Sequence, residues 1–146
     1  MTTVLVLQGP NLDLLGTREP EIYGSETLEE IHRGLAVRAA ELGLRVDFFQ
    51  SNHEGALVDR LHVRDFDVAI VNAAGLTHTS IVLRDALLAI QRPFVEVHLS
   101  DPSTREAFRR VNYLHDIAVE SIVGQGARGY YMALETISKR FGAGDA

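Results

Sequence analysis

The sequence contains no cysteine. Disulfides, thiolate nucleophiles and zinc–thiolate sites are therefore excluded. Lysine is almost as scarce, because only one of the fourteen basic residues, Lys139, is a lysine, and it lies near the C-terminus in a predicted helix. A mechanism through a lysine Schiff base has a single, poorly placed candidate.

Two further absences narrow the class of partner. The formal net charge is -6, which argues against a general nucleic-acid-binding protein, because phosphate contacts need clustered Lys and Arg. No stretch approaches the ~18 apolar residues of a membrane span, and the N-terminal segment lacks the basic start and the long apolar run of a signal peptide. We therefore expect a soluble, cytoplasmic protein with a small-molecule partner, and neither a nucleic acid nor a membrane.

The apolar content indicates one domain with a substantial core. The chain has 146 residues, of which 46% are hydrophobic, and this suits a single catalytic domain over residues 1–146 with a frayed tail at about 142–146. Strands are expected at residues 4–7, 44–50, 67–71, 94–99 and 117–123. Strands that alternate with helices predict an α/β fold with a five-stranded parallel sheet covered on both faces. We favour the flavodoxin-like order 2-1-3-4-5.

Apolar residues at helical spacing mark the connecting helices. One helix follows the capping signal of residues 25–30 and ends at Gly43, and a short one contains Leu57 and Leu61. A third, capped by Thr79 or Ser80, turns five residues inward: Val82, Leu83, Ala86, Leu87 and Ile90. Another short helix is expected around Phe108. The last helix is marked by Tyr131, Leu134, Ile137 and Phe141.

Polar residues are concentrated where the predicted strands end. The first strand breaks at Gly9-Pro10 and continues as a polar loop that carries Asn11, Arg18 and Tyr23 between glycines. A strand followed by such a loop is a common way to build a lidded active site, so residues 17–23 are expected to be mobile without ligand and ordered with it. Three more polar residues follow the third strand, Asn72, His78 and Asp85.

The fourth strand carries an acid and an imidazole on one face. By period-two alternation Glu96, His98 and Ser100 share one face, and the residues between them share the other. A glutamate next to a histidine can orient the ring and favour its protonated form, which suits a proton donor. Glu96 and His98 can equally be an ordinary ion pair at the end of a sheet, and Arg18, Tyr23 and Asp85 can each be solvated side chains. Their convergence on one sheet edge favours a site.

Two other sequence patterns give weaker support for a function. His53, His78 and His98 can be considered as metal ligands, but their spacing fits no familiar motif. Residues 124–129 fit the GxGxxG pattern of dinucleotide-binding proteins. That pattern belongs to the first strand–helix turn and needs an acidic residue on a second strand, whereas here it occurs in the last turn. A tight turn with close helix packing is the expected role.

Five stretches resemble the type II 3-dehydroquinate dehydratases along essentially the whole chain. They are GPNLDLLGTREPEIYG, FFQSNHEGALVDRLH, THTSIVLRDAL, VEVHLSD with the following REAFRR, and VGQGARGYYMALE. The resemblance implies a flavodoxin-like fold and the dehydration of 3-dehydroquinate to 3-dehydroshikimate in the shikimate pathway or in quinate breakdown. It also implies that no metal or organic cofactor is needed, and it implies a homododecamer built as a tetramer of trimers.

The resemblance also implies roles for individual residues. Tyr23 is the expected general base, with Arg18 favouring its deprotonated form, and His98 is the expected general acid, supported by Glu96. Asn11 is expected to position a water near the enolate. Substrate hydroxyls and carboxylate are expected to be held by six residues, two of them (Leu99 and Ser100) through backbone amides: Asn72, His78, Asp85, Leu99, Ser100 and Arg109. Arg105 is a weaker candidate for closing the site.

Several positions depart from the usual family pattern. Gln8 stands where Asn is common, Asn112 stands where Ser is expected, and residues 73–76 lack the usual proline and aromatic residue. None of these departures removes an expected catalytic group. Two alternatives remain: a non-catalytic ligand-binding paralogue on the same fold, and a phospho-acceptor receiver. A receiver needs an acidic residue that closes the third strand and a lysine directly after the fifth, and Asn72 and Gly124-Gln125 stand at those places.

Overall fold

The computed structural model describes residues 1–142 and contains the predicted parallel sheet. Its five strands are β1 (Thr3–Gln8), β2 (Arg45–Gln50), β3 (Val68–Asn72), β4 (Phe94–His98) and β5 (Glu120–Val123). They are ordered β2-β1-β3-β4-β5 and every neighbouring pair is parallel. The predicted fold class and strand order are therefore confirmed. The tail predicted at 142–146 lies, apart from Gly142, outside the described residues.

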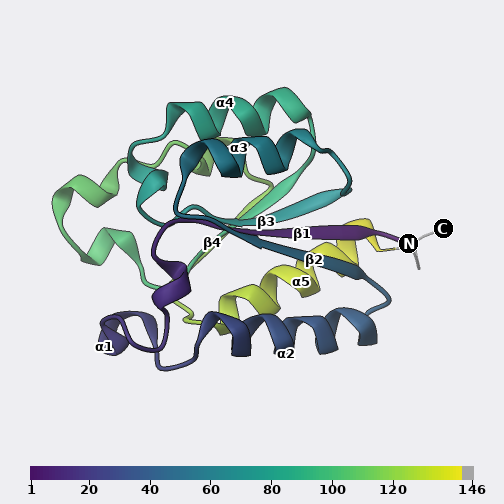
Figure 1. The fold of residues 1–146 in the computed structure, drawn as a ribbon, viewed down its shortest axis with the longest axis horizontal. Coiled ribbons are helices and arrows are strands. Elements are labelled where there is room, and N and C mark those ends of the chain that lie inside the picture. Colours follow the sequence, from purple (N-terminus) through teal and green to yellow (C-terminus); the bar gives the residue numbers. More distant parts are fainter. Residues whose placement is uncertain (143–146) are drawn as a thin grey trace.

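Helices cover both faces of the sheet (Figure 1). One face is covered by α2 (Leu28–Glu41) and α5 (Arg128–Phe141), and the other by α3 (Glu54–His62) and α4 (Ile81–Ile90). The strands divide their apolar side chains between two core clusters, with Val4 and Val6 facing α2 and α5, and Leu5 and Leu7 facing α3 and α4. Continuous apolar strands are what a sheet buried on both faces requires.

The carboxyl ends of the strands lie opposite the two chain ends. Figure 1 shows both chain ends at one side of the molecule and, at the other, the one-turn helix α1 (Pro20–Tyr23) and the irregular segment between β4 and β5. That segment contains three short 3₁₀ turns, Pro102–Thr104, Ala107–Arg110 and His115–Ile117. Loops at this edge are therefore the ones that can form a site in an open α/β sheet.

Local signals explain where the two best-defined helices begin. The Thr27 side chain accepts a hydrogen bond from the Glu30 backbone N–H, and the Glu30 carboxylate accepts one from the Thr27 N–H, which completes a capping box at the start of α2. Ser80 caps α4 by accepting from the Leu83 N–H. The inward stripe of α4 is Leu83, Ala86, Leu87 and Ile90. The prediction that Val82 faces inward was wrong, since it is 55% exposed, because it lies about 100° around the helix from Leu83.

The glycine-rich turn before α5 has the structural role expected of it. A Cβ on Gly129 would lie 3.3 Å from Val97 Cγ1, so the glycine lets α5 approach the sheet closely. The buried stripe of α5 is Tyr130, Ala133, Leu134 and Ile137, so Tyr130, which the sequence pattern did not single out, is the fully buried aromatic residue. None of the helices within residues 1–142 is long and apolar enough to cross a lipid bilayer.

Two boundaries between β4 and β5 differ from the prediction. Strand β5 begins at Glu120 rather than at Ile117, because Asn112 Oδ1 accepts from the backbone N–H groups of Leu114 and His115 and holds the chain in a turn. The short helix expected around Phe108 is a single 3₁₀ turn, and Phe108 is 67% exposed. Local side-chain hydrogen bonds of this kind compete with regular structure.

A half-buried histidine on α2 makes stability depend on pH. His32 stacks on Phe48 with 4.2 Å between ring centroids, and burial lowers its pKa from 6.5 to about 4. Between these values the unfolded chain binds a proton that the folded chain does not, so the free energy of unfolding falls as the pH falls through this window. With allowance for solvent screening, we expect His32 to account for a loss of about 1 kcal/mol between pH 7 and pH 5.

Urea unfolding at pH 7 and pH 5 measures this contribution. The variant His32→Gln keeps an acceptor for its hydrogen-bond partner Gln8 and removes the titrating group. We expect the variant to lose less stability than the wild type over this interval. An equal loss in both proteins would show that His32 does not carry the effect.

Candidate active site

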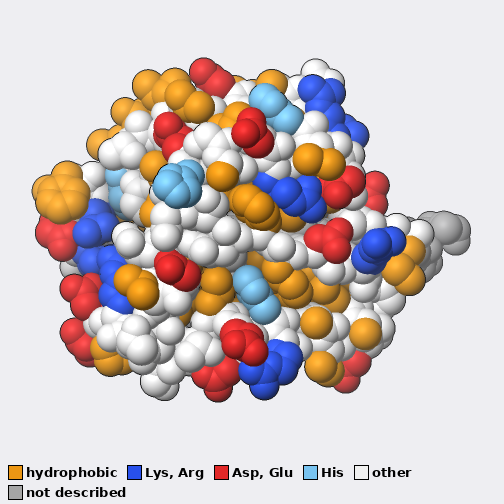
Figure 2. All heavy atoms as spheres, in the orientation of Figure 1, with side chains coloured by type: hydrophobic (Ala, Val, Ile, Leu, Met, Phe, Trp, Pro, Cys, Tyr) orange, Lys and Arg blue, Asp and Glu red, His pale blue; other side chains and the backbone are white. Residues whose placement is uncertain are grey.

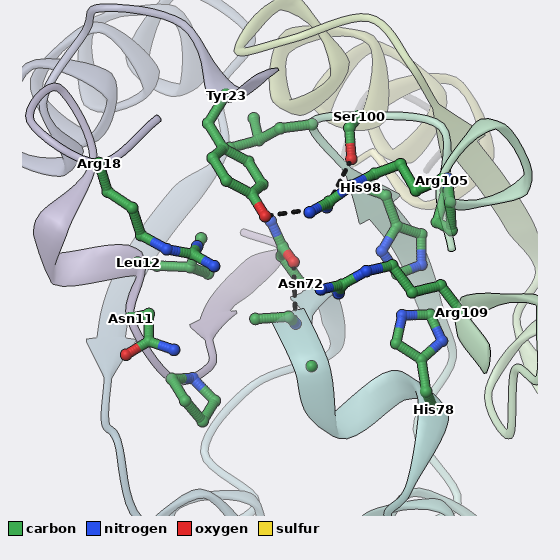
Figure 3. A pocket seen from close by; sticks show the side chains of 15 residues that line it. Asn11, Leu12, Arg18, Tyr23, Asn72, His78, His98, Ser100, Arg105 and Arg109 are labelled. Atoms are coloured by element: carbon green, nitrogen blue, oxygen red, sulfur yellow. Dashed lines mark hydrogen bonds between the residues drawn. The ribbon is translucent and has the colours of Figure 1, made fainter. Parts of the chain in front are cut away.

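A cavity of about 190 Å³ opens at the carboxyl ends of β1, β3 and β4. Figure 3 shows the polar side chains that face one another across it. Most of its wall is polar or basic, and the lining residues come from four separate segments of the chain: Pro10, Asn11, Leu12, Arg18, Tyr23, Asn72, Ala74, Gly75, His78, His98, Leu99, Ser100, Pro102, Arg105 and Arg109.

Nine of the eleven predicted site residues line this cavity: Asn11, Arg18, Tyr23, Asn72, His78, His98, Leu99, Ser100 and Arg109. Glu96 is fully buried directly behind His98. Asp85 is the exception, because it lies on the exposed side of α4 and does not line the cavity. Arg105, the weaker candidate, does line it.

The loop after β1 is held in place by close packing and by an asparagine. A Cβ on Gly9 would lie 2.4 Å from the Ala73 carbonyl oxygen, so only glycine allows the loops after β1 and β3 to meet. Asn11 adopts a left-handed conformation with φ 71°, which asparagine tolerates better than most residues. Its backbone N–H donates to Asn52 Oδ1 at 2.9 Å.

Tyr23 lies between two guanidinium groups. Arg105 Nη1 donates to Tyr23 Oη at 2.8 Å, and the Arg18 Cζ lies 4.5 Å from the centroid of the tyrosine ring. The ring itself is half-buried and packs against the core cluster under α2 and α5. The tyrosine oxygen therefore accepts a charge-assisted hydrogen bond at the wall of the cavity. Arg105, rather than Arg18, makes that hydrogen bond.

His98 and Glu96 form a buried pair on the side of β4 that faces α3 and α4. The His98 Nε2 lies 2.5 Å from Glu96 Oε2, and the alternate residues Val95 and Val97 pack on the opposite face. The predicted alternation along this strand is therefore confirmed. Because a carboxylate can only accept, His98 Nε2 carries the hydrogen of this bond, and Nδ1 is the ring nitrogen available to the cavity.

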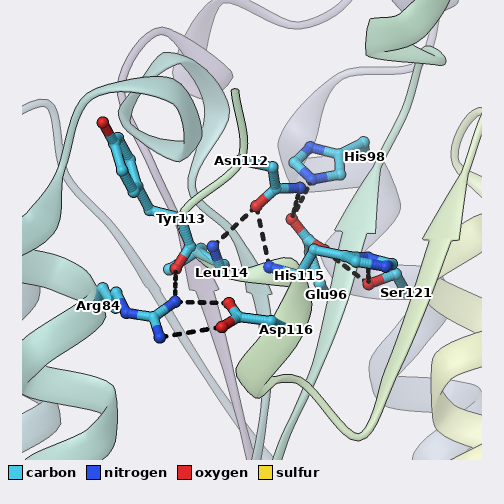
Figure 4. A network of polar contacts seen from close by, with 9 residues as sticks. All are labelled: Arg84, Glu96, His98, Asn112, Tyr113, Leu114, His115, Asp116 and Ser121. Atoms are coloured by element: carbon cyan, nitrogen blue, oxygen red, sulfur yellow. Dashed lines mark hydrogen bonds and ion pairs between the residues drawn. The ribbon is translucent and has the colours of Figure 1, made fainter. Parts of the chain in front are cut away.

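Glu96 is kept ionised by its neighbours (Figure 4). Burial opposes the charged form, but hydrogen bonds from His98, Ser121 and Asn112 outweigh it, and the pKa of Glu96 lies below its ordinary value. Ser121 Oγ donates to Oε1 at 2.6 Å and Asn112 Nδ2 donates to Oε2 at 2.7 Å. Asn112, a departure from the family pattern, is therefore one of the donors to the carboxylate that supports His98.

The segment that carries Asn112 is fixed to α4 by an ion pair. Arg84 donates to the Tyr113 carbonyl oxygen at 2.8 Å and to Asp116 Oδ2 at 3.0 Å. These contacts connect the start of α4 to the turn behind His98 (Figure 4). Because neither Arg84 nor Asp116 contacts the cavity, their effect on the site acts through the position of Asn112.

The rim of the cavity is basic. Figure 2 shows Lys and Arg side chains gathered at the left edge of the face in view, where Figure 1 shows the segment between β4 and β5. Arg109 Nε donates to Glu106 Oε2 at 2.5 Å, which orients its guanidinium. His78 Nδ1 lies 2.7 Å from the Val111 carbonyl oxygen, so Nδ1 must carry a hydrogen and Nε2 is left for the cavity. The arrangement suits an anionic ligand with several oxygens.

The backbone at the end of β4 is tied to the glycine turn. Gly126 N donates to the Leu99 carbonyl oxygen at 3.0 Å and Gly124 N donates to the Ser100 carbonyl oxygen at 3.2 Å. In the loop after β3, Ala74 and Gly75 line the cavity, whereas Leu76 packs against the core under α3 and α4. The absence of an aromatic residue at position 76 therefore does not leave a gap in the cavity wall.

The metal-site alternative finds no support in the part of the chain that the structure describes. His53 begins α3 and does not line the cavity with His78 and His98. No group of three or more His, Asp or Glu side chains within residues 1–142 is arranged to share a metal ion.

Comparison with known proteins gives a consistent result. The family model described as "Dehydroquinase class II" matches residues 2–138. The chain is 56% identical over 135 residues to the 3-dehydroquinate dehydratase of Bordetella avium, which covers 90% of this chain and 94% of that protein. It is 53% identical over 137 residues to that of Acinetobacter baumannii, with 92% and 91% covered.

Solved structures show the same fold. The crystal structure of the type II dehydroquinase from Propionibacterium acnes superposes with a TM-score of 0.91 at 35% identity, over 95% of this chain and 97% of that one. That from Butyrivibrio crossotus gives 0.90 at 36% identity, over 93% and 97%. Because the family model matches residues 2–138 and relatives more than 50% identical cover 90% or more of the sequence, the chain belongs to the class II dehydroquinase family.

Proposed function

We propose that this protein converts 3-dehydroquinate to 3-dehydroshikimate, a hydro-lyase reaction of the shikimate pathway, and that the cavity at the sheet edge is its active site. The observation that carries the proposal is the position of two proton-transfer groups on one cavity. Tyr23, hydrogen-bonded by Arg105, and His98, backed by the Glu96 carboxylate, both line it. An acid and a base on one site suit the removal of water.

The reaction removes a hydrogen and a hydroxyl from neighbouring carbons. A base takes a proton from C2, next to the C3 ketone, and the electrons pass to the ketone oxygen as an enolate. When the enolate collapses, the C1–OH bond breaks, and an acid protonates the departing hydroxyl to give water. The product is an enone. The enzyme must therefore supply a base, an acid and stabilisation of the enolate oxygen.

In this scheme Tyr23 is the base and His98 is the acid. Arg105 donates to the Tyr23 oxygen and Arg18 lies over its ring, and both charges stabilise the phenolate that removes the C2 proton. His98 gives the proton on Nδ1 to the leaving hydroxyl, while Nε2–H remains with Glu96. Asn11 lies on the same wall as Arg18, where its carboxamide can hold a water near the enolate oxygen.

The remaining polar residues of the wall suit the hydroxyls and the carboxylate of the substrate. Arg109, oriented by Glu106, is the candidate partner for the carboxylate. Asn72, His78 and Ser100 surround the same space and offer donors and acceptors for hydroxyl groups. No step of this scheme needs a metal or an organic cofactor, and no step uses Lys139, which lies near the end of α5.

We propose further that the enzyme works as an oligomer, a homododecamer as the resemblance implies. Large apolar side chains are exposed on α4, with Ile81 and Val82 each 55% and Leu88 49% exposed. Figure 2 shows apolar atoms gathered over α4 at the upper edge of the face in view. An apolar helix face of this kind favours a second copy of the chain as its partner. Light scattering of the purified protein measures the number of subunits.

Asp85 is relevant to the proposed oligomer because it lies on the same exposed side of α4 as these apolar residues. If Asp85 binds substrate, it does so in the cavity of a neighbouring subunit, since it does not line its own. Dilution of the oligomer to monomers is then expected to lower activity. An active monomer with wild-type kinetics would separate Asp85 from the reaction.

The absorbance of the enone product tests the proposed function. Purified protein given 3-dehydroquinate is expected to raise the ultraviolet absorbance, and a titration of the substrate gives KM. The alternative, a binding paralogue without catalysis, predicts that calorimetry detects bound dehydroquinate while the absorbance stays constant. The two outcomes are mutually exclusive.

A further inference from the structure

A chain of hydrogen bonds connects the active-site cavity to a histidine of α2. It runs from Asn72 on the cavity wall through Tyr130 and Gln8 to His32. The distances are 2.9 Å from Asn72 Nδ2 to Tyr130 Oη, 2.7 Å from Tyr130 Oη to Gln8 Oε1, and 3.3 Å from Gln8 Nε2 to His32 Nε2. Asn72 is 3% exposed and both Tyr130 and Gln8 are 0% exposed, so water does not compete for these groups.

The sheet register brings the first three members together. Gln8 ends β1 directly opposite Asn72 at the end of β3. Both follow residues that face α3 and α4, so by strand alternation their own side chains lie on the side of α2 and α5. Tyr130, in the first turn of α5, reaches both side chains from above the sheet. The closeness of α5, which depends on Gly129, therefore allows this contact.

The donor and the acceptor of each hydrogen bond in this chain can be assigned from one backbone group, the Ala74 N–H. The Ala74 N–H can only donate, and it donates to Asn72 Oδ1 at 3.1 Å. The Asn72 nitrogen therefore faces Tyr130, whose oxygen accepts, and the Tyr130 hydroxyl hydrogen must point to Gln8 Oε1. Gln8 then presents its nitrogen to His32 Nε2, which accepts because the ring is neutral.

This order leaves the Asn72 carboxamide with one N–H donor for a ligand. Its oxygen is used by Ala74 and one N–H is used by Tyr130, so the second N–H is the donor that remains. Without the Tyr130 oxygen and the Gln8 acceptor beyond it, the carboxamide of Asn72 loses the contact that fixes its rotation. The partner of this remaining N–H must be an acceptor, such as an oxygen of the substrate.

We propose that Tyr130 and Gln8 are positioning residues that hold the Asn72 carboxamide so that one N–H is directed at an acceptor oxygen of the substrate. Neither residue lines the cavity, so both act through Asn72. The inference rests on the proposed function, because it assumes that the ligand of Asn72 is the substrate of the dehydration. The inference also gives a role to Gln8, which departs from the family pattern, and to Tyr130, which follows the glycine-rich turn.

Kinetics of Tyr130→Phe test this positioning. The variant removes one hydroxyl and is expected to raise KM about tenfold while kcat changes less than about threefold, because a ground-state contact to substrate is weakened. The matched control is Tyr131→Phe, the same change at the next residue, whose half-exposed ring lies beside Gly34 of α2; we expect wild-type KM. An unchanged KM in Tyr130→Phe would overturn the inference.

A double-mutant cycle shows whether Tyr130 acts through Asn72. Asn72→Ala is expected to raise KM at least as much as Tyr130→Phe does. In the Asn72→Ala background, adding Tyr130→Phe is expected to change KM less than about twofold, because the group that it positions is already absent. Effects that multiply independently would mean that Tyr130 has only a general structural role.

A pair of substitutions at Gln8 supports the test if Tyr130→Phe does not fold. Gln8→Met removes the acceptor for the Tyr130 hydroxyl and is expected to raise KM several-fold. Gln8→Glu keeps an acceptor oxygen for Tyr130, as an acid that donates to His32 or as a carboxylate paired with it, and is expected to restore KM to within about twofold of the wild type. Equal KM values in the two variants would contradict the inference.

Failure of the inference and failure of the proposed function have different signatures. If the wild type does not form the enone, the proposed function is wrong and the inference is wrong with it. If the wild type turns over and Asn72→Ala raises KM, but Tyr130→Phe and Gln8→Met do not, only the positioning role is wrong.

Discussion

Tyr23→Phe is expected to lower kcat about 10³-fold or more while the protein stays folded. The substitution removes only the hydroxyl oxygen that accepts a hydrogen bond from Arg105, so the aromatic ring keeps its packing against the core under α2 and α5. General base catalysis contributes about 10² to 10⁴ in rate, and the cavity wall has no second group in the same position. Steady-state measurement of enone formation gives the value.

The affinity of Tyr23→Phe for the substrate shows whether the variant has lost only the general base or the binding site as well. Calorimetry with 3-dehydroquinate is expected to give a dissociation constant within about tenfold of the wild-type KM, because Arg109, Asn72 and His78 are untouched. Circular dichroism and light scattering check the fold and the assembly. Activity close to that of the wild type would exclude Tyr23 as the base.

His98→Asn is the second substitution with a large expected effect. It removes the ring that lines the cavity and donates to Glu96, so the leaving hydroxyl has no positioned proton donor. We expect kcat to fall about 10² to 10⁴-fold. In this variant Ser121 and Asn112 still donate hydrogen bonds to the Glu96 carboxylate. The buried charge therefore keeps two hydrogen-bond partners.

His115→Asn is the matched control for this experiment. His115 approaches the same carboxylate from the other side, with Nδ1 3.0 Å from Ser121 Oγ and 3.8 Å from Glu96 Oε1. Its side chain is 71% exposed and does not line the cavity that contains Tyr23. We expect a change in kcat of less than about threefold. A loss as large as that of His98→Asn would assign the acid role to the wider network rather than to His98.

Strand positions and the face of Glu96 and His98 follow from the sequence because they depend on local periodicity. Buried parallel strands give continuous apolar segments, and strand alternation puts Glu96 and His98 on one face whatever surrounds them. The convergence of Asn11, Tyr23, Asn72 and His98 was predictable from topology, since all follow strands that end at one edge.

Contacts made by neighbouring segments were not predictable in this way. The hydrogen bond from Arg105 to Tyr23 joins residues 82 positions apart, and nothing near Arg105 in the sequence marks that partner. The start of β5 was misplaced because the Asn112 side chain holds the preceding residues in a turn. Val82 was misplaced because an apolar residue beside a buried stripe can equally face another subunit.

The lid also stays a prediction. The segment predicted to open and close includes Arg18 and the one-turn helix α1, and Tyr23 at its end lines the same cavity as His98. Glycines with φ of 92° at Gly16 and 90° at Gly24 bound it. Hydrogen exchange of residues 17–23 with and without substrate is expected to show protection on binding.

Hydrogen exchange at C2 of the substrate tests the division of labour between Tyr23 and His98 most directly. Nuclear magnetic resonance of 3-dehydroquinate in D₂O follows loss of the C2 proton signal separately from the appearance of product. We predict that His98→Asn exchanges a C2 proton for deuterium with little elimination, because Tyr23 still forms the enolate, and that Tyr23→Phe does neither. Exchange that persists in Tyr23→Phe and is lost in His98→Asn would contradict the account.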